Sequence, residues 1–135
     1  MKEGIITERK DTDLIKWGEI YLVNFENGKG AETKGINPAI IIQNDMGNKH
    51  SRCTNVIPLM PYTKHNEEIE YLFINLLPNE SGLNECLTAD ITQTTVIDKS
   101  RLIRKIGNIR DKKVMDTIIE ALAKYLNVIE NSKIQ

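Results

Sequence analysis

A short basic run containing a histidine lies in the first half of the chain. It consists of Lys49, His50, Ser51 and Arg52, and Lys34 lies some way ahead of it. The unperturbed pKa of a histidine lies near neutral pH, so His50 suits general acid–base chemistry. Lysine, arginine and serine side chains can instead hold phosphate groups without cutting them. A solvated turn is the plainer interpretation of the run, and the sequence leaves all three open.

Two β-rich segments must position this run. Residues 38–44 are apolar and β-branched, which predicts a buried strand, and residues 54–60 predict the next one. Residues 44–48 have the composition of a tight turn, because Asn, Asp and Gly tolerate positive φ. Pro58 inside the second segment predicts an edge strand or a bulge. A loop over residues 26–35 precedes both segments. Its glycines, which make it easy to bend and costly to order, are Gly28, Gly30 and Gly35.

The remaining elements follow from composition and capping signals. Three further strands are predicted over residues 18–25, 69–77 and 85–96. Asp98 is expected to cap a short helix over residues 99–106, and Asp111 a final helix with apolar residues at helical spacing. About five antiparallel strands with helices mainly at the C-terminal end indicate an α+β domain, or a barrel with a helix packed on it.

Composition limits the function further. The chain has 135 residues and a formal net charge of -1, which excludes a globally basic nucleic-acid binder but not a local basic groove. The two cysteines and two histidines are too few and too widely spaced to predict a disulfide framework or a zinc site, so we expect no metal and no cofactor. No segment resembles a signal peptide or is long enough to span a bilayer. We therefore expect a cytoplasmic protein with no membrane partner.

Four short motifs follow one another along the chain. They are GEIY at residues 18–21, Gly30-x-Glu32-x-x-Gly35-x-x-Pro38, IIQNDMGN at residues 41–48, and QTTVIDKSRL at residues 93–102. Together they resemble the MazF/PemK family of toxin–antitoxin ribonucleases, over roughly residues 16–128. The resemblance implies a small SH3-like antiparallel β-barrel of the CcdB/MazF type with a C-terminal helix, assembled as a homodimer.

The resemblance also sets the expected domain limits. Residues 17–129 are expected to form the toxin-like domain. Residues 1–16 are then an N-terminal extension, and residues 130–135 a frayed tail.

The chemistry implied by the resemblance is the cutting of single-stranded RNA without a metal. This needs a base for the attacking hydroxyl, a cation or donor for the negative phosphorane-like charge, and an acid for the leaving oxygen. The family places an Arg immediately before the proline of the second strand and a Thr at the end of the third. Here these positions hold Asn37 and, counted from Pro58 and Leu59, Met60. Losing one such donor costs on the order of 3 kcal/mol, about a hundredfold in rate.

Other residues are candidates to compensate. Glu32 keeps its family position and either orders the loop or serves as a base. Asn37, Met60, Glu32 and His50 are therefore the candidate catalytic residues. The candidate RNA contacts are Lys34, Lys49, Ser51, Arg52, Gln93 and Thr95, the last two because the family strand that carries them lies near the RNA groove. The charges at residues 98–101 also fit a helix start on the surface.

Two functions remain open from the sequence. The first is a toxin that cuts single-stranded RNA with a non-standard active site and is silenced by a MazE-like antitoxin lying across the dimer groove. The glycine loop would be its flexible element. The alternative is a catalytically inactive dimer that binds nucleic acid or an antitoxin-type partner. We lean toward the enzyme, because cleavage is the usual role of the family.

Overall fold

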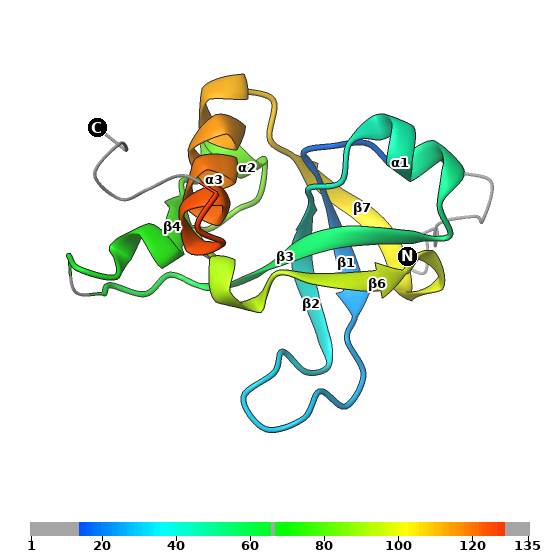
Figure 1. Cartoon of the computed structure of the whole chain (residues 1–135), viewed down its shortest axis with the longest axis horizontal. Coiled ribbons are helices and arrows are strands. Elements are labelled where there is room, and N and C mark those ends of the chain that lie inside the picture. The colour runs from blue at the N-terminus through cyan, green and yellow to red at the C-terminus, as the bar shows by residue number, and fades with distance from the viewer. Residues whose placement is uncertain (1–13, 66, 129–135) are drawn as a thin grey trace.

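The body of the molecule is an antiparallel sheet (Figure 1). The computed structural model describes residues 14–65 and 67–128, so the expected frayed tail and most of the N-terminal extension lie outside the described residues. The strands are β1 (Glu19–Asn24), β2 (Ile36–Ile41), β3 (Cys53–Pro61), β4 (Phe73–Leu76), β5 (Leu87–Asp90), β6 (Thr95–Asp98) and β7 (Leu102–Asn108). The predicted α+β class is confirmed. In the part of the chain that the structure describes there are seven strands rather than five, and their pairing follows an open path, β4-β5-β3-β2-β1-β7, rather than a closed barrel.

Strand β3 organises the sheet. Its first residues pair with β6, its middle residues with β2, and its last residues with β5. Pro58 lies where β3 changes partners, because the β6 partners end at Val56 and the β5 partners begin at Leu59. The missing N–H of proline therefore falls where one edge of β3 has no paired strand. The predicted edge strand or bulge was wrong: Pro58 sits in the central strand, opposite Ala39 of β2, in a ladder without a register shift.

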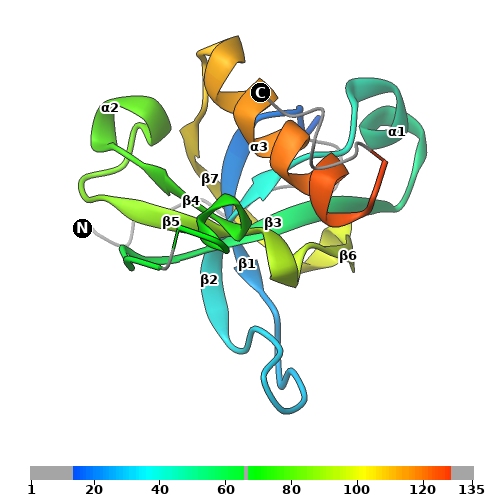
Figure 2. The same cartoon turned by 60° about the vertical axis from the view of Figure 1, so that its left-hand side comes forward.

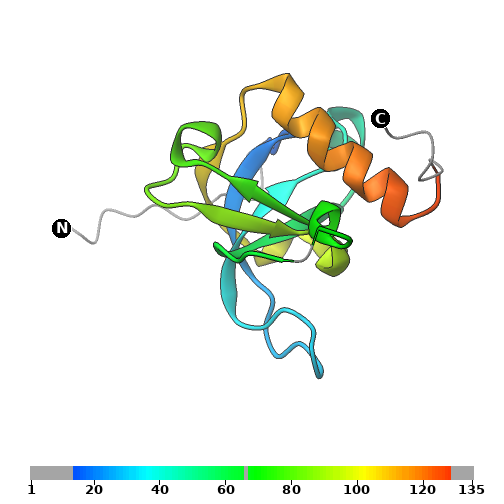
Figure 3. The same ribbon diagram turned by 90° about the vertical axis from the view of Figure 1, so that its left-hand side faces the viewer.

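The helices are α1 (Asp45–His50), α2 (Pro78–Ser81) and α3 (Lys112–Tyr125), with 3-10 turns η1 (Glu70–Leu72), η2 (Ile91–Gln93) and η3 (Lys99–Arg101). Figure 3 shows α3 as the long helix lying along one side of the strands. Its residues Met115, Ile118 and Ala121 are buried in the main core with side chains of β1 to β5. A second core cluster on the other face of the sheet joins residues of β1, β2, β3, β6 and β7.

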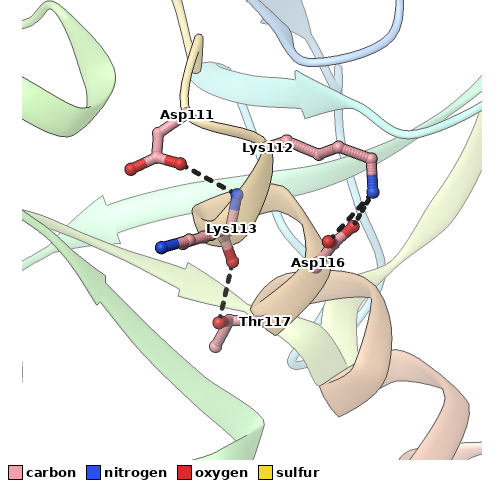
Figure 4. Close-up of polar contacts among 5 residues, drawn as sticks. All are labelled: Asp111, Lys112, Lys113, Asp116 and Thr117. Carbon is pink, nitrogen blue, oxygen red and sulfur yellow. Dashed lines mark hydrogen bonds and ion pairs between the residues drawn. The ribbon is translucent and has the colours of Figure 1, made fainter.

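The predicted cap of α3 is confirmed in Figure 4. The backbone N–H of Lys113 donates to Asp111 Oδ1 at 2.9 Å. Lys112 Nζ pairs with Asp116 one turn further on, at 3.0 Å. The helix therefore begins where the local capping signal predicts, and its buried residues stabilise it by packing in the main core.

Four predicted elements differ from the structure. Residues 44–48 form the start of α1 rather than a turn, because the Asn44 side chain accepts the N–H of Gly47 as a helix cap. The strand predicted over residues 69–77 is only β4, preceded by η1. The strand predicted over residues 85–96 is two strands, because Asp90 caps the turn η2 between them.

The helix predicted over residues 99–106 was also wrong. Asp98 does cap a helical turn, by accepting the N–H of Ser100, but that turn is η3 and ends at Arg101. Residues 102–108 then form β7, which pairs with β1. The local capping signal was read correctly, and long-range pairing decided what followed it.

Candidate functional site

Strand pairing relates the two positions at which the chain departs from the family pattern. In the ladder between β2 and β3, Ala39 lies opposite Pro58 and Ile41 opposite Val56. The ladder ends at the Ala39–Pro58 pair, and Asn37 and Met60 each lie two residues beyond it along their own strand. Residues opposite one another in an antiparallel ladder point to the same face, as do residues two apart in one strand, so both side chains belong to one face at one end of the strand pair. Thr95 pairs with Val56 and shares that face by alternation.

The environment of Asn37 shows how its side chain is used. Asn37 is half-buried, and its Nδ2 donates to the backbone oxygen of Lys34 at 2.6 Å. The amide therefore fastens the end of the β1–β2 loop to β2. The Lys34 side chain is exposed beside it. Met60 is also half-buried, and it pairs with Thr88 of β5.

The β1–β2 loop projects away from the body of the molecule (Figure 2). At its root Phe25 and Gly35 are hydrogen-bonded, and the Gly35 N–H donates to Glu26 O at 2.8 Å. Near its tip Glu32 Oε1 accepts the N–H of Lys29 at 2.6 Å. This contact supports a loop-ordering role for Glu32. The left-handed φ angles of Gly30 and Gly35, 61° and 71°, suit glycine.

An open hollow of about 1160 Å³ lies between this loop and the segment from η2 to η3. Gly28, Glu32 and Gly35 line it from the loop, and Gln93 and Thr95 from the other side. The hollow thus brings together candidates from two motifs that are sixty residues apart. Asn37 and Met60 are not among its lining residues.

Arg101 also lines this hollow and was missed as a site residue. Its Nη1 lies 2.6 Å from Glu26 Oε1, and the same nitrogen donates to Asn24 O at 3.4 Å. Arg101 belongs to the fourth motif, at residues 93–102, and this could have marked it as a site residue. A surface charge at a helix start explains an arginine there equally well, so the sequence did not single Arg101 out.

The basic run at residues 49–52 lies at the opposite end of β3 from Met60. Lys49 and His50 end α1, and Ser51 and Arg52 connect it to Cys53, the first residue of β3. From Cys53 to Met60 the strand extends roughly 23 Å, at about 3.3 Å per residue. All four residues of the run are exposed. Within one chain, the structure therefore does not bring His50 to Asn37 and Met60.

Asp98 lines the hollow and also lies within electrostatic reach of Arg52 in the basic run. Hydrogen bonds from the Ser100 side chain and backbone hold the pKa of Asp98 below its ordinary value, and the charges of Arg101 and Arg52 act in the same direction. Asp98 is thus a fixed negative charge beside Arg101. Of the basic run, Arg52 lies close enough to lower the pKa of Asp98.

Residues 14–65 and 67–128 contain neither a metal-binding cluster nor a membrane-spanning helix. This part of the chain has no group of three or more His, Cys, Asp or Glu side chains arranged to hold a metal ion. It also has no helix that combines the length and apolar character needed to cross a membrane.

The fold defined by this sheet and helix is that of MazF-type proteins. The structure of MazF from Deinococcus radiodurans matches with a TM-score of 0.71 at 16% identity, covering 85% of this chain and 98% of that one. A mycobacterial endoribonuclease in complex with its cognate antitoxin matches with a TM-score of 0.67 at 17% identity, covering 85% and 97%.

Sequence comparison identifies the family. Residues 16–126 match the model of the PemK-like, MazF-like toxins of type II toxin–antitoxin systems, and the chain belongs to this family. Endoribonuclease EndoA of Bacillus subtilis is 28% identical over 117 residues, which cover 87% of this chain and 98% of that protein. Endoribonuclease MazF of Staphylococcus saprophyticus is 29% identical over 103 residues, covering 76% and 84%.

Proposed function

We propose that this chain is the toxin of a type II toxin–antitoxin system and an endoribonuclease that acts on single-stranded RNA without a metal. The observation that carries the proposal is the family match over residues 16–126. Relatives that align with most of the chain bear the name endoribonuclease. A position in the cytoplasm, where RNA is available, belongs to the same proposal.

The site must work differently from that of a family member with Arg and Thr. The amide of Asn37 is neutral, and its Nδ2 donates to Lys34 O. Met60 has no proton to donate. Glu32 is the candidate base, since its Oε1 orders the loop and its second oxygen remains to take a proton from the attacking hydroxyl. Arg101, in the hollow beside the loop, is a candidate cation for substrate phosphates.

Partners follow from the family and its solved structures. We include in the proposal a homodimer and a MazE-like antitoxin, because Deinococcus radiodurans MazF was solved with MazE. The β1–β2 loop and the hollow beside it form the surface that RNA and antitoxin would share. A bound antitoxin would then silence the protein by blocking the path of the RNA.

The Asn37 contact favours a second candidate function. One N–H of the Asn37 amide already donates to Lys34 O, so only its other N–H, on a neutral group, is left to stabilise an anionic transition state. Losing one such donor costs on the order of 3 kcal/mol, and Met60 is a second loss. A catalytically inactive dimer that binds nucleic acid or an antitoxin would keep the fold and the hollow without needing either group.

Cleavage of a long single-stranded RNA by the purified protein, in the presence of a chelator, separates these functions. Defined fragments with the wild type support the endoribonuclease, and their loss in Asn37→Ala would assign Asn37 a role. Intact RNA at high protein concentration would contradict cleavage. Binding of the same RNA, measured in parallel, would then favour the inactive dimer.

A further inference from the structure

Two polar residues, Thr88 and Asn75, continue a row of paired residues that starts at Met60. Met60 of β3 lies opposite Thr88 of β5, and Thr88 lies opposite Asn75 of β4. Paired residues share a face, so the three side chains lie on the face that carries Asn37 by the register of β2 and β3. Their neighbours Leu59, Ala89 and Ile74 point the other way, into the main core or against it.

Hydrogen bonds fix the outermost side chain of this row. The N–H of Thr63 donates to Thr88 Oγ1 at 3.1 Å. The hydroxyl proton of Thr88 is thus left for Asn75 Oδ1, which accepts it at 2.6 Å. Thr88 is fully buried, so this chain of bonds is held by the fold. With Oδ1 accepting from Thr88, Nδ2 lies at the other end of the Asn75 amide.

The other end of that amide is available. Asn75 is exposed, and within residues 14–65 and 67–128 its Nδ2 has no hydrogen-bond partner. An oriented N–H donor on the surface is suited to an anionic or carbonyl acceptor. Asn75 lies two strands from Met60, about 10 Å at the usual strand spacing of about 4.8 Å. At that distance Asn75 cannot reach an RNA phosphate bound beside Met60. It can reach the phosphate of a neighbouring nucleotide in the same RNA.

We propose that Asn75 contacts the substrate, with Nδ2 donating to a phosphate oxygen of single-stranded RNA next to the scissile position. This inference rests on the proposed function, because it needs RNA to lie along this face. It extends the RNA site from the β1–β2 loop across β3 and β5 to β4. Thr88 is the positioning residue, since it touches Asn75 and not the RNA. Phosphate contacts of this kind set the register of the bound strand.

Binding to a labelled 2′-O-methyl RNA tests the contact, because this probe lacks the attacking hydroxyl and stays intact. Asn75→Ala should raise Kd several-fold, to about tenfold, since it removes one donor to a charged acceptor. Asn75→Asp should raise it further, because its carboxylate keeps the Thr88 bond but repels phosphate. That additional loss should shrink as salt is added. The matched control Asn84→Asp, at another exposed asparagine, should leave Kd unchanged.

Thr88→Val tests the positioning role of Thr88. It should raise Kd by less than Asn75→Ala does. In the double variant, Kd should equal that of Asn75→Ala alone. Thermal unfolding of each variant confirms that it is folded. If the wild type binds and Asn75→Ala binds equally well, the Asn75 contact is overturned while the proposed function stands. If the wild type neither binds nor cuts RNA, both are overturned.

Discussion

Gln93 Oε1 accepts hydrogen bonds from both the backbone N–H and the hydroxyl of Thr33, at 3.1 and 3.4 Å. One side-chain oxygen on η2 thereby holds the β1–β2 loop against the edge of the hollow. The ion pair between Arg101 and Glu26 makes a second connection nearer the root of the loop. Gln93 was expected from the sequence to contact RNA, and this geometry gives it a positioning role as well.

Removing the Gln93 oxygen should loosen the loop. In Gln93→Leu, the backbone amide of Thr33 loses its acceptor, so hydrogen exchange at residues 29–34 should become faster. Gln93→Glu is the matched control, because a carboxylate can accept both bonds from Thr33. Equal exchange in the wild type and Gln93→Leu would mean that the loop is ordered by its own contacts, such as that of Glu32 with Lys29.

The lowered pKa of Asp98 should make the free energy of unfolding fall at acid pH. Ser100 hydrogen bonds lower the pKa of Asp98 from 3.8 in the folded protein. The ionised side chain therefore stabilises the fold above the ordinary pKa, and this contribution is lost as the pH falls through the lowered value. Urea midpoints of the wild type should drop more steeply below about pH 4 than those of Asp98→Asn, which still caps η3 but cannot titrate.

Ser100→Ala tests the cause of the Asp98 shift. The variant removes the hydroxyl that contributes most to lowering this pKa, so the pKa should rise toward its ordinary value. An NMR titration of the carboxyl carbon measures it directly. An unchanged pKa in Ser100→Ala would shift the explanation to the backbone hydrogen bond and the neighbouring arginines.

The cap of α3 is a prediction about stability alone. Asp111→Ala should lower the free energy of unfolding by about 1 kcal/mol, because the Lys113 N–H loses its partner (Figure 4). Asp111→Ser should retain most of the stability that Asp111→Ala loses, since a serine side chain also caps helices. Lys112→Ala is the control: its pair with Asp116 is exposed and should contribute less than about 0.5 kcal/mol. A larger loss from Lys112→Ala in chemical denaturation would contradict this ranking.

Local signals in the sequence predicted part of the fold. The first three strands and α3 follow from hydrophobic periodicity and caps, both of which depend on nearby residues. The η2 break did not follow, although the Asp90 cap that forms it is local. Strand β7 did not follow because it is stabilised by pairing with β1, some eighty residues away. Helix α1 depends on Asn48, a buried side chain whose amide donates to Gln43 O and whose oxygen accepts from Thr54. No periodicity predicts such a network.

For the candidate site, motif order selected Asn37, Met60, Glu32 and Gln93, and their roles stay predictions. The fold shows how these residues lie relative to one another. Sequence proximity misplaced His50 relative to them, because α1 and the length of β3 separate the basic run from Met60. Asn75 and Thr88 belong to no motif. Only the register of β3, β5 and β4 brings them beside Met60.

Restoring the family residues should raise cleavage, because Asn37 and Met60 share one face of the sheet, each two residues beyond the last pair of the β2–β3 ladder. Asn37→Arg supplies a cation on this face and Met60→Thr a hydroxyl beside Thr88. Together they should increase the cleavage rate by about a hundredfold, the usual effect of one or more transition-state donors. Ile36→Arg is the matched control, since it adds the same charge at an exposed neighbour that points to the opposite face of β2. A gain in both variants would indicate stronger RNA attraction by charge alone. No gain in the double variant, with RNA binding intact, would mean that the substrate lies along a different path from the one that these two positions define.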